Sequence, residues 1–149
     1  MTKKSSMIGK RRNELREQLR PTIRPEQIWD RKKSKGFTTI PRQMPYFLRA
    51  MDTLSSGRPV SQTYLALWCR CYDEGVVKLE HQDMAFESGF TGQRGVQTWR
   101  DRIRTLSELG FILTAEGASG PLSHALILNP FLVVKNLHGA GKIPTRESL

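Results

Sequence analysis

The stretch that decides the fold is Glu80–Asn129, EHQDMAFESGFTGQRGVQTWRDRIRTLSELGFILTAEGASGPLSHALILN. It opens with a short segment of helical pattern (81–88), which a Gly-Phe-Thr turn (89–91) separates from a long proline-free segment (92–109). Two apolar segments around a tip rich in Gly and Pro then predict a β-hairpin (111–128). The order helix, turn, helix and hairpin predicts that the second helix is held at the surface of the domain.

The segment 92–109 is predicted to be an amphipathic helix that follows Thr91 as its N-cap. At 100° per residue, one side gathers four apolar side chains, namely Val96, Trp99, Ile103 and Leu106. The other side is polar and carries Arg94, Gln97, Thr98, Asp101, Arg104 and Thr105, with Gln93 and Arg100 at its margins. We expect the apolar side, including Trp99, to lie in the core and the polar side to face outward.

The polar side of this helix is a candidate for reading DNA. Arg and Gln present forked donors that match the guanine and adenine edges in the major groove. The candidates for contact with bases are the polar residues near the start of the helix, Gln93, Arg94, Gln97 and Thr98. The candidates for contact with the DNA backbone are Thr91, Gly92, Arg100 and Arg104. The alternative is that these side chains only solvate the outer face of a helix in a basic protein.

The positive charge of the chain is concentrated at its N-terminus. The 149 residues carry a formal net charge of +10, which favours an anionic partner. Residues 1–35 hold twelve Lys or Arg and four Asp or Glu, and therefore contribute +8 (12 − 4). We expect a flexible arm with at most a short helix over Ile8–Leu19, because little apolar area is available to fix it.

This arm supplies further candidate contacts with DNA phosphates, namely Arg11, Arg12, Lys32, Lys33 and Lys35. Cationic segments before a helical DNA-binding domain commonly follow the backbone or the minor groove. The alternative is a solubilising tail without a specific role.

We expect three parts in the chain: the basic arm (1–36), a folded domain (37–138) and a polar C-terminal tail (139–149). At the start of the domain, Pro45 suits the first turn of a helix whose apolar stripe ends before Gly57.

The remaining elements of the domain follow from caps and apolar patterns. Ser61 is the expected N-cap of a widely apolar and central helix, which Gly75 ends. Val76–Leu79 fits a short strand. Asn129 is the expected cap of a last helix with four inward-facing side chains, Phe131, Leu132, Val134 and Leu137.

The sequence has no pattern typical of an enzyme, a cofactor site or a small-molecule site. Its three His and two Cys match no zinc spacing, and Cys69 and Cys71 are not expected to bond to each other. Gly139–Lys142 lacks the spacing of a phosphate-binding loop, and no carboxylates are paired for acid-base chemistry. We therefore expect no catalysis, no metal, no cofactor and no small-molecule substrate.

The sequence also lacks the patterns of a secreted or membrane protein. No run reaches the roughly 18 apolar residues of a membrane span, and the basic N-terminus has no apolar core of a secretory signal. We expect a soluble, cytoplasmic and nucleoid-associated protein without a membrane partner.

Residues 37–137 resemble small winged helix-turn-helix proteins of bacterial plasmids, integrative elements and phages. The resemblance rests on four segments, Thr39-Ile40-Pro41, Leu67-Trp68-Cys69-Arg70, Gly89-Phe90-Thr91-Gly92-Gln93-Arg94 and Leu109-Gly110-Phe111-Ile112. It implies a mostly α (α+β) fold with extra flanking helices, in which the hairpin is the wing. A wing that grips the minor groove usually carries a cation, but residues 111–129 contain no Lys or Arg.

The resemblance implies sequence-specific binding of double-stranded DNA by a transcriptional regulator or a replication or maintenance factor of a mobile genetic element. A homodimer is compatible with this function, through either the first helix (45–54) or the last (130–137) of the domain. Two alternatives remain open. One is a winged-helix module that docks a replication or partition protein, and the other is an RNA-binding accessory protein.

Overall fold

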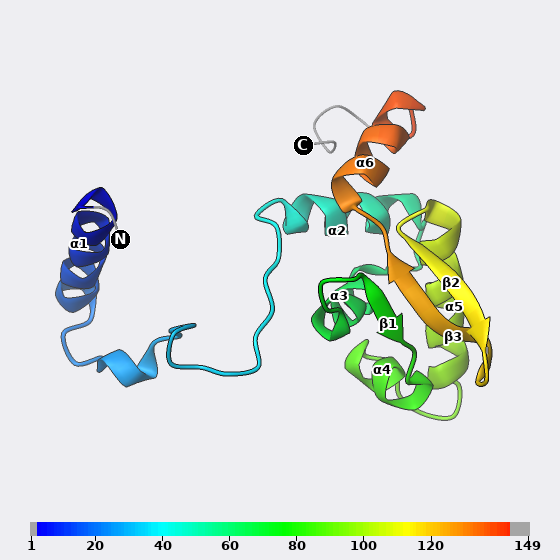
Figure 1. Cartoon of the computed structure of the whole chain (residues 1–149), viewed down its shortest axis with the longest axis horizontal. Helices are drawn as coiled ribbons and strands as arrows, with labels where there is room; N and C mark the ends of the chain where they lie inside the picture. The colour runs from blue at the N-terminus through cyan, green and yellow to red at the C-terminus, as the bar shows by residue number, and fades with distance from the viewer. Residues whose placement is uncertain (1–2, 144–149) are drawn as a thin grey trace. The chain divides into compact units, whose positions relative to one another are not determined.

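The computed structural model of the chain describes residues 3–143 and, from residue 7 onward, their side chains. The described part is a mixed α+β structure with six α-helices, a short 3-10 helix and a three-stranded antiparallel sheet (Figure 1). It divides between Phe37 and Thr38 into two compact units. No helix within residues 3–143 is both long enough and apolar enough to cross a membrane.

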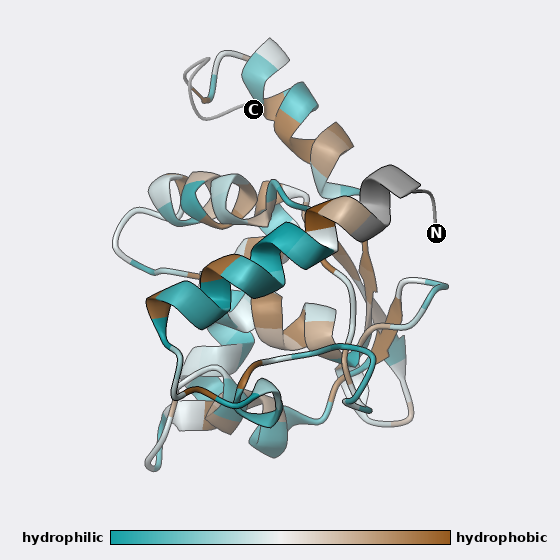
Figure 2. Cartoon of the chain, turned by 90° about the vertical axis from the view of Figure 1, so that its left-hand side faces the viewer, coloured by the Kyte–Doolittle hydropathy of each residue, from teal (hydrophilic) through white to brown (hydrophobic). Residues whose placement is uncertain are grey.

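The N-terminal unit contains helix α1 (Lys3–Leu19) and the 3-10 helix η1 (Pro25–Gln27). Helix α1 starts five residues before the predicted helix and ends where we expected, just ahead of Pro21. It is mainly hydrophilic (Figure 2). Its few apolar side chains are largely exposed. Trp29 is also exposed in this unit, so the described side chains here form little buried core.

The second unit follows the predicted order of helix, helix, strand, helix, helix, hairpin and helix. Its elements are α2 (Met44–Leu54), α3 (Ser61–Arg70), β1 (Val76–Lys78), α4 (His81–Glu87), α5 (Gly95–Leu109), β2 (Ile112–Gly117), β3 (Gly120–Ile127) and α6 (Pro130–Gly139). The predicted strand before α4, the hairpin after α5 and the position of Pro45 in the first turn of α2 are confirmed.

The sheet has the strand order β1-β3-β2, with β3 between the other two (Figure 1). Val77 of β1 pairs with Ala125 of β3, and both side chains are buried in the core. Their neighbours along the strands point to the opposite face, because side chains alternate along a strand. One face of the sheet therefore covers the core, and the other does not.

The core of this unit is built around large side chains from the helices and the hairpin. Trp99 of α5 is fully buried, as predicted, together with Ile103 and Leu106 of the same helix. Tyr64 of α3 packs edge-on against Phe111, at 5.9 Å between ring centroids. The apolar side of α5 is thus closed in by other elements of the unit.

The start of α3 is capped differently from the prediction. Ser61 is the first helical residue and not the N-cap, which is Val60. The capping carboxylate comes from Asp52 of α2, which accepts hydrogen bonds from both backbone N–H groups at 2.8 Å and from the Ser61 hydroxyl at 2.6 Å. A carboxylate there satisfies free donors and is favoured by the helix dipole.

The predicted end of α3 is also wrong. The helix ends at Arg70 rather than near Gly75, and Tyr72, expected on its apolar side, is exposed. The intervening residues form a turn that leads into β1, in which the Gly75 N–H donates to the Tyr72 carbonyl at 3.1 Å.

Helix α6 begins as predicted, since the Asn129 side chain accepts a hydrogen bond from the Phe131 N–H at 3.0 Å. The predicted inward side is wrong for Leu132, which is exposed, and it omits Val133, which is buried together with Val134. Phe131 is 44% exposed, but its ring packs edge-on against Phe47 of α2, at 4.8 Å between ring centroids. The buried side is set by contact with α2, which the apolar pattern of α6 does not specify. Ile143 is buried too, so the fold continues past residue 138, while residues 144–149 of the predicted tail lie outside the described residues.

Candidate nucleic-acid interface

Helices α4 and α5 pack against each other and are joined by a tight turn. The turn is fixed by backbone hydrogen bonds from Gly89 to Phe86 and from Phe90 to Ala85, at 3.0 and 2.9 Å. Gly95 is buried against the backbone of the preceding turn. A Cβ added to it would lie 2.8 Å from the Phe90 carbonyl oxygen. The turn therefore requires glycine at the first position of α5.

The predicted start of the helix at residue 92 is wrong by three residues. Helix α5 begins at Gly95, and Arg94 is its N-cap, with no hydrogen bond from its side chain. Thr91 is therefore not the cap, and Gln93 lies in the turn instead of the helix. The cause is a local loop in which the Gly95 N–H donates to the Gly92 carbonyl at 3.2 Å.

The outward side of α5 is accessible, as predicted. Among the candidates for contact with bases, Gln93, Arg94 and Gln97 are exposed and Thr98 is half-buried. Thr91 and Gly92 are exposed in the turn. The structure thus gathers these residues on one surface, made by the turn and the first two turns of α5.

Two of the polar side chains on this surface are engaged by Asp101. Its carboxylate accepts a hydrogen bond from the Gln97 amide at 3.2 Å and pairs with Arg104 at 3.0 Å. Both contacts are between exposed groups on one helix, where such pairs contribute only a few tenths of a kcal/mol. Within residues 3–143, Arg94 has no ion-pair or hydrogen-bond partner for its side chain, so its guanidinium is available to a ligand.

Arg100 has a different position from the one predicted for a backbone contact. It is half-buried, and its Nε donates to His81 Nδ1 at 3.1 Å. The other ring nitrogen of His81 lies 2.6 Å from the Leu122 carbonyl oxygen. Because a carbonyl only accepts, Nε2 carries the proton and Nδ1 is the acceptor for Arg100. Arg100 therefore links α5 through α4 to β3.

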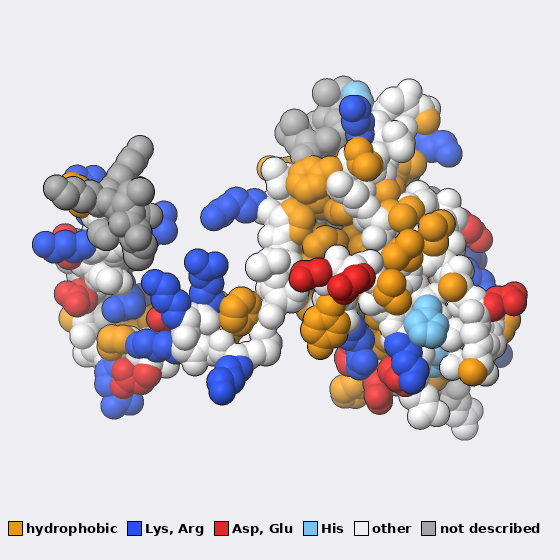
Figure 3. Space-filling view, in the orientation of Figure 1, with side chains coloured by type: hydrophobic (Ala, Val, Ile, Leu, Met, Phe, Trp, Pro, Cys, Tyr) orange, Lys and Arg blue, Asp and Glu red, His pale blue; other side chains and the backbone are white. Residues whose placement is uncertain are grey.

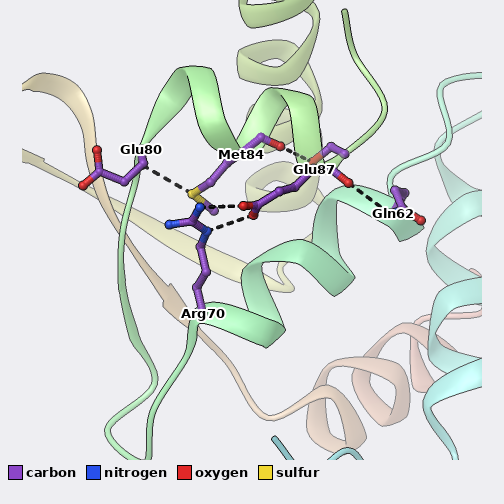
Figure 4. Close-up of polar contacts among 6 residues, drawn as sticks. Gln62, Arg70, Glu80, Met84 and Glu87 are labelled. Carbon is purple, nitrogen blue, oxygen red and sulfur yellow. Dashed lines mark hydrogen bonds and ion pairs between the residues drawn. The ribbon is translucent and has the colours of Figure 1, made fainter. Parts of the chain in front are cut away.

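A bidentate ion pair connects α3 with the end of α4 (Figure 4). Arg70 donates to both carboxylate oxygens of Glu87, at 2.9 and 2.6 Å, and Gln62 donates to the Glu87 carbonyl at 3.0 Å. The hydrogen bond from Arg70 lowers the pKa of Glu87, against the opposing effect of burial. The same contact raises the pKa of Arg70. These bonds fix the position of α4, the helix that packs against α5.

Arg102 is a half-buried residue of α5 that the sequence analysis did not single out. Its guanidinium carbon lies 5.4 Å from the centroid of the Phe90 ring, a cation–π distance. It covers the aromatic residue of the turn and so stabilises the path of the chain into α5. The sequence indicated this role only weakly, because Arg102 lies at the border between the polar and the apolar side of the helix.

The predicted phosphate contacts of the arm lie in the N-terminal unit. Arg11 and Arg12 are exposed on α1, and Lys32, Lys33 and Lys35 are exposed after η1. The backbone N–H groups of Lys32 and Lys33 donate to Asp30, at 2.9 and 3.0 Å, so the lysines follow a hydrogen-bonded turn. Their side chains make no ion pair within the described residues.

The remaining titratable groups among residues 7–143 include two cysteines and no cluster of metal ligands. Cys69 and Cys71 are free thiols, which confirms that they do not bond to each other. Within the described part of the chain, no three His, Cys, Asp or Glu side chains gather in a group that could hold a metal ion.

Replacing Gly95 by Ala is expected to destabilise the second unit by about 1–3 kcal/mol, because the new methyl group meets backbone atoms of Phe90 that cannot rotate away. Chemical denaturation measures the change. The matched control is Gly139→Ala, where a Cβ meets no atom within 4 Å and the effect should stay within about 0.5 kcal/mol. Equal midpoints for Gly95→Ala and the parent would show that the turn is not as tight as described.

Replacing Glu87 by Gln is expected to lower stability at neutral pH by less than about 1 kcal/mol, since the pair with Arg70 is partly exposed. The lowered pKa of Glu87 means that its contribution is present above the ordinary carboxyl pKa and is lost as the pH falls through the folded pKa. The difference between parent and variant should therefore shrink below about pH 4. Thermal unfolding at several pH values measures it, and in an Arg70→Gln background the same substitution should have little effect at any pH.

No family model matches the chain, and no curated protein or solved structure is detectably similar to it.

Proposed function

We propose that the protein binds double-stranded DNA in a sequence-specific manner, as a winged helix-turn-helix regulator or a replication or maintenance factor of a mobile genetic element. The observation that carries the proposal is the two-sided character of α5. Trp99, Ile103 and Leu106 of one side are fully buried and Val96 is half-buried. Arg94 and Gln97 are exposed on the other side, at the N-terminal end, where helices of this class contact bases.

The arrangement of the elements supports this class. A short strand (β1) precedes α4 and α5, and a hairpin (β2–β3) follows them, which is the order that the resemblance implies. The hairpin pairs with β1 through β3, so the sheet is tied to the start of the helix pair. Helices α2 and α6 are then the extra flanking helices.

Arg94 is the principal candidate for reading a base, because its free guanidinium matches the O6 and N7 acceptors of guanine. Gln97 can reach an adenine once it leaves Asp101, at the small cost of an exposed hydrogen bond. Asp101 itself can accept a hydrogen bond from the cytosine amino group and disfavours phosphate. Arg104 is a phosphate contact at the border of this surface, whereas Arg100 has a structural role in binding His81.

The basic arm supplies sequence-independent affinity in this proposal. Its exposed cations and its net charge of +8 favour phosphates, and each neutralised phosphate adds close to one unit to the slope of log affinity against log salt. The arm compensates for a hairpin that contains no Lys or Arg.

The second candidate function is a module that docks a protein partner, which the exposed Leu113 and Leu126 of the cation-free hairpin favour. Binding of RNA by the basic arm is a third, less specific alternative. Competition between a selected duplex and structured RNA for the full chain separates the nucleic acids. Failure of the chain to retain any duplex at low salt would favour the protein-docking function.

Replacing Arg94 by Ala is expected to weaken binding to a selected duplex by roughly 1–3 kcal/mol and to relax the preference for guanine at one position. The duplex comes from selection out of a random pool, and fluorescence anisotropy measures affinity for selected and scrambled sequences. Arg58→Ala, an exposed arginine in the loop between α2 and α3, is the control and should change both affinities little. Equal losses of Arg94→Ala on both duplexes would remove Arg94 from the residues that read bases.

Replacing Lys32, Lys33 and Lys35 together by Gln is expected to reduce the salt slope by up to about one unit per lysine. The preference for the selected sequence should stay unchanged, because contacts with phosphates carry no sequence information. Titrations at several salt concentrations measure the slope. A slope equal to that of the parent would place the three lysines off the DNA.

A further inference from the structure

The face of the sheet that does not cover the core carries a row of exposed aliphatic side chains. Val76 of β1 and Leu113 of β2 both pair with Leu126 of β3, so the three lie side by side across all three strands. Their exposed fractions are 51%, 52% and 37%. An antiparallel sheet with one covered face usually places polar residues on the other. This row is thus unusual for a sheet that faces water.

The apolar surface continues from this row towards α6. A groove of about 440 Å³ lies beside it, lined by aromatic residues that include Trp68, Tyr72 and Phe131. Gly75 belongs to the groove, and a Cβ built on it would lie 3.5 Å from the Leu126 side chain, so the groove and the row are continuous. Figure 3 shows hydrophobic side chains gathered over this face. A continuous exposed apolar surface of this kind marks an interface.

The two ends of this face differ in charge, since one carries two acids and the other carries a lysine paired with a single acid. Glu74 lies two residues before Val76 and Lys78 two residues after it, and both are exposed. At about 3.3 Å per residue, Lys78 is roughly 7 Å along β1 from Val76. Asp73, which borders the groove, adds a second acid at the Glu74 end. Neither acid has an ion pair within residues 3–143, while Lys78 pairs at 3.6 Å with the exposed Glu80.

We propose that this face is the seam of a homodimer. A closed dimer of identical chains brings the same surface of both copies together, related by a half-turn. If the axis runs along the row across the strands, each of its three aliphatic residues meets its own counterpart. The same rotation reverses the strand direction and brings Lys78 of each copy to the Asp73–Glu74 end of the other. The surface is therefore complementary to itself in apolarity and in charge, which favours a second copy over an unrelated partner.

Helix α2, which the sequence suggested as a dimer seam, is less suited to this role, because Phe47, Ala50 and Met51 are buried within their own unit. Helix α6 buries Val133 and Val134 but exposes Phe131, which lines the groove and so extends the sheet face instead of forming a separate seam. Within the described residues of the second unit, no other element covers this sheet face, which lies opposite the core-facing side that α5 packs against. The dimer leaves the outward side of α5 accessible and does not depend on binding of DNA.

The test is sedimentation velocity of the full chain over a wide concentration range, after nuclease treatment, so that bound nucleic acid cannot bridge copies of a basic protein. We expect a concentration-dependent dimer. Leu126→Asp at the centre of the row should raise its dissociation constant by about tenfold or more. Leu113→Asp, on an edge strand, tests the same face where the fold tolerates a charge more easily. Phe86→Asp is the matched control, because Phe86 is 72% exposed on α4, away from the sheet, and should leave the dimer unchanged.

The orientation of the dimer is tested by charge reversal. Lys78→Glu alone and Asp73→Lys with Glu74→Lys should each weaken association, and the combination of all three should restore it. Circular dichroism verifies that each variant is folded. The proposal is overturned if the parent stays monomeric at its highest concentration, or if both aspartate variants of the row dimerise like the parent. It is also overturned if the triple charge reversal does not restore association.

Discussion

The burial of the Trp99 side of α5 is the constraint on which the rest of the second unit depends. A helix that places a tryptophan, an isoleucine and a leucine in the core has only its opposite side left for solvent. The Trp99 indole N–H has no hydrogen-bond partner among the described residues, so its place is determined by packing and not by a polar bond. The ring lies 4.9 Å from that of His81, which connects this packing to the polar link between α4 and β3. Helix, turn and hairpin are thereby held in one arrangement.

The elements that could be predicted from the sequence are those that local patterns determine. The phase of α5 followed from its helical period, the hairpin from alternation around a glycine-rich tip, and the start of α6 from Asn129. The errors arose where a contact outside the helical pattern decides. Thr91 followed by Gly92 has the local pattern of a helix start, but the contact between Gly95 and Phe90 moves the first turn along the chain. The cap of α3 could not be read locally, because it comes from the preceding helix.

In the candidate site, too, local patterns predicted some features and tertiary contacts decided the others. Helical phase correctly predicted which side of α5 is accessible, but it could not say which cations are already bound within the protein. Arg104 shares the polar side of the helix with Arg94, and Arg100 lies at its margin. The structure binds Arg100 to His81 in a partly buried contact and pairs Arg104 with Asp101 only at the exposed surface. The partner of Arg100 is nineteen residues away in the sequence, beyond the reach of helical spacing. The distinction between a cation available to a ligand and one that stabilises the fold therefore required the tertiary structure.

The carboxylate of Asp52 has a consequence for how this domain tolerates changes in length. Asp52 belongs to α2 and binds the start of α3, so its side chain fixes the length of the loop that connects the two helices. A residue added to or removed from that loop would pull the carboxylate away from its donors and tilt two helices at once. The tip of the hairpin has no such tether, and the domain can lengthen there without disturbing its interior. Natural variation in this fold should accordingly concentrate at the tip and leave the first helical connection constant in length.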